Sequence, residues 1–132
     1  MSMNYLVADS VARIRNAYAA RHAFVVVCYS KLVVAILGVL KSEGYIEDFE
    51  EIDVRSGVKS IHVALKYRRG KSVINKIDII SKPGCRYRSA IKSLPKVASG
   101  LGIFVLSTSK GVISDSAARR MNVGGEVLVS VA

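Results

Sequence analysis

The sequence predicts an α+β fold made of two small subdomains. In the N-terminal half, segments with apolar residues at helical spacing alternate with strand-like segments, which predicts helices packed on a three-stranded sheet. In the C-terminal half, short apolar runs between turn signals predict a mostly β subdomain with short helices. The 132 residues and the hydrophobic content of 51% are sufficient for one compact core or for two small ones.

The first half of the chain is expected to begin with an amphipathic helix. Apolar side chains recur every three or four residues from Asn4 to Ala20. The run Phe24–Cys28 then predicts a short buried strand, with Cys28 in the core. Ser30 is a suitable N-cap for a second helix, and Gly44 is typical of a helix end because glycine adopts a left-handed backbone conformation without strain.

Two further strands complete the predicted N-terminal subdomain. Residues 45–54 and 60–67 are rich in strand-forming side chains, and the turn Arg55-Ser56-Gly57 between them predicts a hairpin. Six acidic residues lie between Glu43 and Asp53. Carboxylates in such a segment suit metal binding or acid/base chemistry only with further ligands nearby, and no histidine is close in sequence. A solvent-exposed sheet edge is therefore the favoured interpretation.

The turn Arg68–Lys71 marks a change in composition, and we place the subdomain boundary there. Residues 1–67 then form the N-terminal subdomain and residues 68–132 the C-terminal one. The C-terminal half is expected to begin with a strand at 73–80, a basic stretch with turn signals at 82–88 and a short helical turn at 94–96. A strand at 103–106 then leads through a hydroxyl-rich strand-to-helix turn at 107–111 into a helix at 115–121, which Ser114 opens as N-cap. A closing strand is expected at 126–131.

The charge of the chain points to a polyanionic partner. It contains 20 lysine and arginine residues against 10 aspartate and glutamate residues, a formal net charge of +10. Residues 1–66 carry 8 basic and 7 acidic side chains, whereas residues 67–132 carry 12 basic and 3 acidic ones. The C-terminal half is therefore expected to form the surface that attracts a polyanion such as a nucleic acid.

The motifs of common enzymes and metal sites are absent from the sequence. It has no G-x-S-x-G elbow, no H-E-x-x-H pair and no G-x-x-x-x-G-K-[ST] phosphate loop. Cys28 and Cys85 lie far apart with no histidine at ligand spacing, so we expect no metal, no cofactor and no disulfide framework. Since His22 and His62 are isolated, a hydrolase with a triad assembled from distant residues is the alternative from another class.

The most apolar segment is better explained by a protein core than by a membrane span. Ala23–Leu40 carries a single charge, Lys31, and a lysine at the centre of a membrane helix costs about 2.5–3.5 kcal/mol. The polar break at Tyr29 and Ser30 also divides this segment into a strand-like and a helix-like part. Charged residues interrupt any signal-peptide pattern at the N-terminus, so a cytoplasmic protein is expected.

Three features of the C-terminal half suit binding to RNA. The stretch Lys66–Lys96 contains ten basic residues and a single acidic one, and offers contacts to phosphates. Tyr87 lies between Arg86 and Arg88, where an aromatic ring or a guanidinium can stack on a base. The turn Ser107–Gly111 presents small hydroxyls that fit the shallow minor groove of RNA and reach its 2′-hydroxyls. A generic RNA-binding or translational repressor protein is a second alternative.

Short blocks distributed over essentially the whole chain narrow the interpretation. They are Ala12–Ala17, Ser30–Leu32, Gly44–Ile46, Leu65–Tyr67, Lys82–Gly84, Leu94–Val97, Gly100–Ile103, Ser107–Gly111 and Gly124–Val127. With these blocks, in this order, the sequence closely resembles the bacterial form of the eighth protein of the small ribosomal subunit. The last three blocks are the most specific, and the final one indicates a bacterial or organellar source.

The resemblance implies a structural, non-catalytic protein of the cytoplasmic ribosome. It implies binding to the central domain of small-subunit ribosomal RNA, where the protein helps to assemble the platform of the subunit. The implied protein neighbours include the fifth and twelfth proteins of the small subunit. In some bacteria the family also represses its own operon by binding messenger RNA, which is a second role that the resemblance implies.

The RNA-binding residues expected from the basic stretch, the hydroxyl turn and the resemblance lie in both subdomains. The hydroxyl-rich turn and the surface around it form the main group, and the N-terminal subdomain makes further contacts. The residues are Lys82, Arg86, Tyr87, Arg88, Ser107, Thr108, Ser109, Lys110, Gly111, Gly124, Gly125 and Glu126 in the C-terminal subdomain, and Arg13, Arg15, Asn16 and Lys31 in the N-terminal one.

One position departs from the family pattern. Members of the family usually carry a tyrosine two residues after the arginine that matches Arg86, whereas this chain has Arg88 there and Tyr87 one position earlier. In a strand, a shift of one residue moves a side chain to the opposite face of the sheet. Either a local bulge restores the stacking of Tyr87, or Arg88 stacks in its place.

Overall fold

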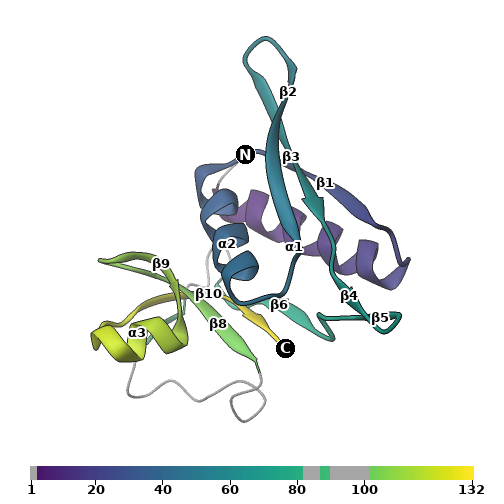
Figure 1. Cartoon of the computed structure of the whole chain (residues 1–132). Coiled ribbons are helices and arrows are strands. Elements are labelled where there is room, and N and C mark those ends of the chain that lie inside the picture. The colour runs from purple at the N-terminus through teal and green to yellow at the C-terminus, as the bar shows by residue number, and fades with distance from the viewer. Residues whose placement is uncertain (1–2, 82–86, 90–101) are drawn as a thin grey trace. The chain divides into compact units, whose positions relative to one another are not determined.

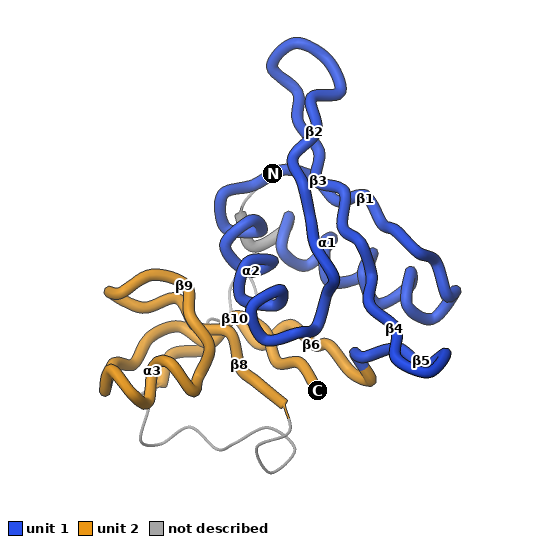
Figure 2. Tube along the Cα trace, viewed as in Figure 1, with its two compact units in different colours: residues 1–74 blue, residues 75–132 orange. Residues whose placement is uncertain are grey.

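The chain folds into two compact units, residues 1–74 and residues 75–132 (Figure 2). The structure, a computed structural model, describes residues 3–81, 87–89 and 102–132. In these residues three helices accompany antiparallel sheets, which confirms the predicted α+β fold.

Unit 1 contains two helices and a three-stranded antiparallel sheet. Its helices and the strands of this sheet are α1 (Met3–Ala19), β1 (Phe24–Cys28), α2 (Lys31–Ser42), β2 (Asp48–Arg55) and β3 (Val58–Ala64) (Figure 1). The strands lie in the order β1-β3-β2, so β3 is paired on both sides. Both predicted helices and the predicted hairpin are therefore confirmed.

The short hairpin β4 (Tyr67–Arg68) and β5 (Lys71–Ser72) also belongs to unit 1. The Tyr67 hydroxyl donates a hydrogen bond of 2.6 Å to the carbonyl of His22, and the Val73 amide donates one of 3.3 Å to the carbonyl of Lys66. These bonds connect the hairpin to residues that precede it. The units consequently divide after Ile74, beyond the boundary that the composition indicated after Tyr67.

The ends of α2 follow the expected chemistry only in part. Ser30 has the extended backbone of an N-cap, but its side chain makes no capping hydrogen bond. At the other end, Glu43 is the C-cap and Gly44 follows with a φ of +83°. Since glycine adopts this left-handed conformation without strain, the predicted helix end at Gly44 is confirmed.

The expectation that Cys28 is buried is wrong. Cys28 is exposed, and Phe24 is 66% exposed, whereas Val27 between them is 1% exposed. Strand β1 lies at the edge of the sheet, and only one of its faces meets the core. A continuous apolar run does not by itself distinguish a strand buried on both faces from one buried on a single face.

Unit 2 is a mostly β unit with one described helix. Its elements are β6 (Ile77–Ile79), β7 (Arg88–Ser89), β8 (Ile103–Thr108), β9 (Gly111–Ser114), α3 (Asp115–Met121) and β10 (Gly125–Val131). The sheet order is β6-β10-β8-β9, and β7 also pairs with β10. The predicted strand 73–80 is thus shorter than expected, and the predicted helical turn 94–96 lies outside the described residues.

Helix α3 covers one face of this sheet. Ala118 of α3, Leu106 of β8 and Val127 of β10 form a fully buried cluster. The hydroxyl oxygen of Ser114 accepts a hydrogen bond of 3.3 Å from the amide of Ala117, which confirms Ser114 as the N-cap. The helix thereby begins directly after β9.

Tyr18 connects three segments of unit 1. It is 4% exposed, and its hydroxyl donates a hydrogen bond of 2.8 Å to the carbonyl of Tyr45 and accepts one of 3.1 Å from the amide of Lys66. Its ring packs edge-on against Tyr67 at 5.5 Å between centroids. Burial raises the pKa of Tyr18 above its ordinary value, the hydrogen bond from Lys66 lowers it, and the neighbouring Tyr67 raises it further.

We expect Tyr18→Phe to lower the free energy of unfolding by about 1–2 kcal/mol, because it removes the hydrogen bond to the carbonyl of Tyr45 and the one from the amide of Lys66. Urea denaturation followed by circular dichroism measures this change. Tyr29→Phe is the matched control. The contact of Tyr29 with the ammonium group of Lys59 is made by its ring, which phenylalanine keeps. An equal loss in both variants would contradict the proposed role of the Tyr18 hydroxyl.

The same variant tests the raised pKa of Tyr18. The unfolded chain loses the phenolic proton near pH 10, before the folded chain does, so this stabilising contribution is complete below pH 10 and is lost as the pH rises through the folded-state pKa. The wild-type protein should therefore lose stability more steeply than Tyr18→Phe above pH 10.

Candidate nucleic-acid interface

The hydroxyl-rich segment forms the hairpin between β8 and β9. Ser107 and Thr108 are the last residues of β8, Ser109 and Lys110 form the turn, and Gly111 begins β9 with a φ of +103°. The expectation of a strand-to-helix turn is therefore wrong. The short strand β9 intervenes because Val112 and Ile113 pair with β8 before α3 begins.

The side chain of Thr108 stabilises this turn. Its hydroxyl donates a hydrogen bond of 2.8 Å to the carbonyl of Gly111 and accepts one of 3.1 Å from the amide of Lys110. Ser109 and Lys110 are exposed at the tip. The hairpin therefore presents the hydroxyl of Ser109 and the ammonium group of Lys110 on a turn whose conformation is fixed by the hydrogen bonds of Thr108.

Gly125 allows strand β10 to lie very close to the hairpin. It pairs with Thr108, and a Cβ atom at Gly125 would lie only 2.1 Å from the carbonyl oxygen of Ser107. Any larger residue must push the two backbones apart, since the obstructing atom belongs to the backbone. The glycine requirement at this position is thus a packing requirement of the hairpin itself.

Pairing across three strands brings sequence-predicted residues together. Glu126 of β10 lies opposite Arg88 of β7 on one side and opposite Ser107 of β8 on the other. Directly paired residues of an antiparallel sheet share a face, and the neighbouring Leu106 and Val127 face α3. Arg88, Glu126 and Ser107 therefore form a cross-strand row, which we call the polar row, on the face opposite α3.

The register also separates Tyr87 from Arg88. The carbonyl of Tyr87 accepts a hydrogen bond of 2.9 Å from the amide of Val127, and the amide of Tyr87 donates one of 3.0 Å to the hydroxyl of Ser81. Tyr87 thus lies in line with Val127, and strand alternation directs its side chain, which is 48% exposed, away from the polar row. Arg88 shares the face of Ser107 instead.

The other predicted residues of unit 2 are only partly described. Gly124 is exposed and precedes β10, after Asn122 has ended α3 in a left-handed conformation with a φ of 54°. Lys82 and Arg86 lie outside the described residues.

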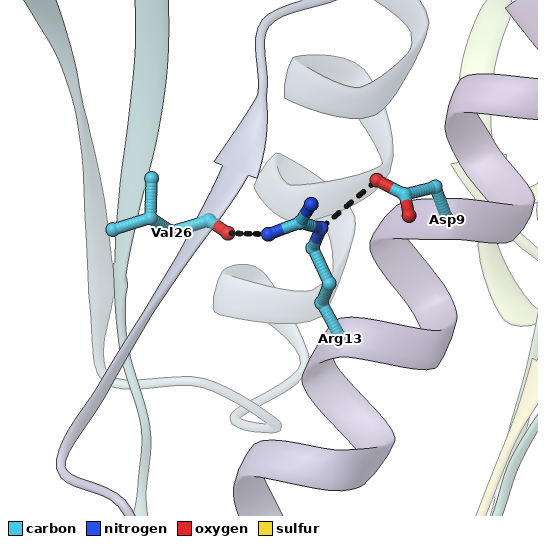
Figure 3. Close-up of polar contacts among 3 residues, drawn as sticks. All are labelled: Asp9, Arg13 and Val26. Atoms are coloured by element: carbon cyan, nitrogen blue, oxygen red, sulfur yellow. Dashed lines mark hydrogen bonds and ion pairs between the residues drawn. The ribbon is translucent and has the colours of Figure 1, made fainter.

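The predicted residues of unit 1 lie on its helices. Arg13 of α1 forms an ion pair of 2.9 Å with Asp9 and donates a hydrogen bond of 3.5 Å to the carbonyl of Val26 in β1 (Figure 3). Its guanidinium therefore connects the helix to the edge strand, although the side chain is exposed. Arg15 and Asn16 are exposed on α1, and Lys31 is exposed at the start of α2.

A further cationic group in unit 1 was not among the predicted site residues. Arg68, Arg69 and Lys71 are exposed on the β4–β5 hairpin, and the guanidinium of Arg21 donates a hydrogen bond to the carbonyl of Gly70. The sequence identified this hairpin only as part of a basic stretch. No sequence pattern indicated that Arg21 belongs to this group, because its contact with Gly70 joins residues that are far apart in the sequence.

Both units carry net positive charge. Residues 1–74 contain 11 basic and 7 acidic side chains, and residues 75–132 contain 9 basic and 3 acidic ones. Among the described residues, no three histidine, cysteine, aspartate or glutamate side chains are grouped to hold a metal ion. No helix in the described part of the chain is long and apolar enough to cross a membrane.

A basic chain whose exposed hairpin carries a hydroxyl and an ammonium group has the charge that is typical of nucleic-acid-binding proteins. Comparison with known proteins identifies the family. The model of the family Ribosomal protein S8 matches residues 6–132. The chain is 51% identical to the small ribosomal subunit protein uS8 of Allorhizobium ampelinum and 50% identical to that of Gluconobacter oxydans, each over 131 residues that cover 99% of both chains.

The protein therefore belongs to the ribosomal protein S8 family. The resemblance inferred from its sequence blocks is confirmed. This is a family of structural ribosomal proteins, so the chain is not an enzyme and the hydrolase alternative is wrong.

We expect Gly125→Ala to destabilise the protein by about 1–3 kcal/mol, because the added methyl group overlaps the backbone of Ser107. Thermal and urea unfolding measure the loss. Gly38→Ala in α2 is the matched control, since apart from its chain neighbours and the backbone of its own helix no described heavy atom lies within 4 Å of the position of its Cβ. A helical alanine at this position should preserve or raise stability by up to about 1 kcal/mol, and a comparable loss in both variants would contradict the packing argument.

Proposed function

We propose that this protein is a structural component of the small ribosomal subunit and binds the central domain of small-subunit ribosomal RNA. Family membership supports the first part, since the relatives are named small ribosomal subunit proteins. The polar row and the adjacent hairpin tip are the observation that supports RNA binding, and the resemblance of the sequence blocks supports the central domain as the binding site. The protein then acts in the cytoplasmic ribosome, beside protein neighbours that include the fifth and twelfth small-subunit proteins.

In this proposal, cationic residues attract the RNA. The exposed cations Lys110 and Arg120 of unit 2 and those of the β4–β5 hairpin of unit 1 neutralise phosphates and release counterions. Such contacts carry no sequence information and weaken as salt rises. They account for attraction to RNA in general, and the site of binding needs a different set of groups.

The hairpin and the polar row select the site. Ser107 and Ser109 offer small hydroxyls that reach ribose hydroxyls and base edges. Gly111 takes the left-handed conformation that follows the turn, and Gly125 allows β10 to lie against the hairpin. The guanidinium of Arg88 stacks on a base or binds it through two hydrogen bonds. Glu126, between Arg88 and Ser107, is placed to orient that guanidinium and to accept hydrogen bonds from the RNA.

Titration of the full chain with a central-domain ribosomal RNA fragment over a salt series tests the proposal. We expect Ser107→Ala/Ser109→Ala to weaken binding about tenfold without changing the salt slope, because hydroxyls carry no charge. Lys110→Gln should instead reduce the slope by roughly one phosphate contact. Thr108 is left intact, since its hydroxyl holds the turn. Equal affinity of the wild-type protein for unrelated RNA hairpins would overturn the claim of a specific site.

The polar row also predicts which residue stacks on the RNA. Arg88→Gln should weaken binding to the same fragment by about tenfold, because it removes a charge and a stacking plane. Tyr87→Leu should change it by less than about twofold, since its side chain projects toward the other face. The reverse order of effects would show that Tyr87 makes the contact.

A further inference from the structure

Among the described residues of unit 1, no helix covers one of the two faces of its three-stranded sheet. The covered face carries Val27, Ile61 and Val63, none more than 1% exposed, and α1 lies across it (Figure 1). On the opposite face, Phe24 is 66% and Val26 43% exposed. Large apolar side chains with this much contact to water, side by side on one strand, are typical of a surface that binds a partner.

Strand pairing divides the uncovered face into an apolar and an acidic flank. The central strand β3 pairs with β1 on one side and with β2 on the other. Directly paired residues share a face, so apolar residues of β1 and carboxylates of β2 stand on either side of β3. Two rows run across it: Phe24–Ala64–Asp48 and Val26–His62–Glu50. We call these two rows the uncovered face.

A shallow groove of about 210 Å³ lies over these two rows. It is lined by Phe24 and Ala64 as well as by Asp48, Glu50 and His62, so apolar and acidic groups contact the same space. Lys41 forms an ion pair of 2.9 Å with Asp48 and holds the pKa of that carboxyl below its usual range. Both acidic side chains are exposed.

Charge decides which class of partner fits. Two of the six acidic residues of the segment 43–53, Asp48 and Glu50, lie in these rows, in a chain that is otherwise strongly basic. Carboxylates repel the phosphates of RNA, which disfavours RNA on this face. They attract lysine and arginine side chains, and the apolar flank stabilises a partner that buries aliphatic carbon.

The edge of β1 is partly occupied, which favours docking on the face over strand addition. The guanidinium of Arg13 binds the carbonyl of Val26 (Figure 3). A partner strand pairing with β1 would have to displace this contact. A partner that lies across the uncovered face leaves it intact.

We propose that the uncovered face binds a positively charged segment of another protein, with apolar side chains on Phe24 and Val26 and lysine or arginine side chains facing Asp48 and Glu50. The identity of the partner as a ribosomal neighbour rests on the proposed function, whereas the binding chemistry does not. The face therefore serves protein contacts, and the polar row and hairpin of unit 2 serve RNA contacts.

Binding of a fluorescent peptide of alternating lysine and leucine to the full chain tests the chemistry. Val26→Thr and Glu50→Gln should each weaken binding about fivefold. Val54→Thr and Glu51→Gln are the controls, because Val54 is also exposed to water, at 64%, but lies outside the rows, and Glu51 lies on the other face of β2, opposite Ile61. Equal effects of Glu50→Gln and Glu51→Gln, or equal affinity for a lysine–serine peptide, would overturn the proposal.

A photo-reactive benzoylphenylalanine in place of Phe24 tests the partner in assembled small-subunit particles. A cross-link to a lysine- and arginine-rich protein segment supports the proposal, and its loss in Glu50→Lys but not in Glu51→Lys would locate the contact. A cross-link to RNA or to a second copy of this chain, or no cross-link, would overturn it. The RNA titration is independent of the peptide experiment, so failure to bind ribosomal RNA would overturn the proposed function and leave the peptide result standing.

Discussion

Strand β10 is paired on both edges, with β8 on one side and with β6 and β7 on the other. The candidate RNA interface depends on this double pairing. It places Glu126 between Arg88 and Ser107, and it forces the hairpin backbone against Gly125 so closely that no side chain fits there. The same strand supplies Val127 to the core beneath α3. The geometry of the interface is therefore fixed by the packing that stabilises unit 2.

Exposure alone does not show that a charged side chain serves a ligand. Arg13 is exposed, yet its guanidinium holds Asp9 and the edge of β1, and Arg21 is exposed while bound to the hairpin at Gly70. The bonds of Arg13 to Val26 and of Arg21 to Gly70 each connect segments that are separate in the sequence. Removing either arginine would change both the local structure and the charge, so loss of RNA binding in such a variant would not identify a direct contact.

The sequence predicted what depends on local pattern. Helical spacing located α1, Gly44 located the end of α2, and Ser114 located the start of α3, because each signal acts within a few residues. The exposure of Cys28 and the hairpin at Ser109 could not be predicted from a local pattern. The first depends on which face the helices cover, and the second on whether Val112 and Ile113 pair with β8, which is a contact between strands. The ambiguity between Tyr87 and Arg88 likewise required the register with β10.

Attraction and fit place different demands on the backbone. Charges act over roughly 8 Å in physiological salt, so a cation on a hairpin tip such as Arg69 needs no fixed position. A hydroxyl must lie within a few tenths of an ångström of its partner to form a hydrogen bond. Ser107 accordingly lies in a paired strand, and Ser109 on a turn held by Thr108. The amino-acid composition is therefore sufficient to predict electrostatic attraction to RNA. The positions of the hydroxyls that form hydrogen bonds can be predicted only when strand register and backbone contacts are known.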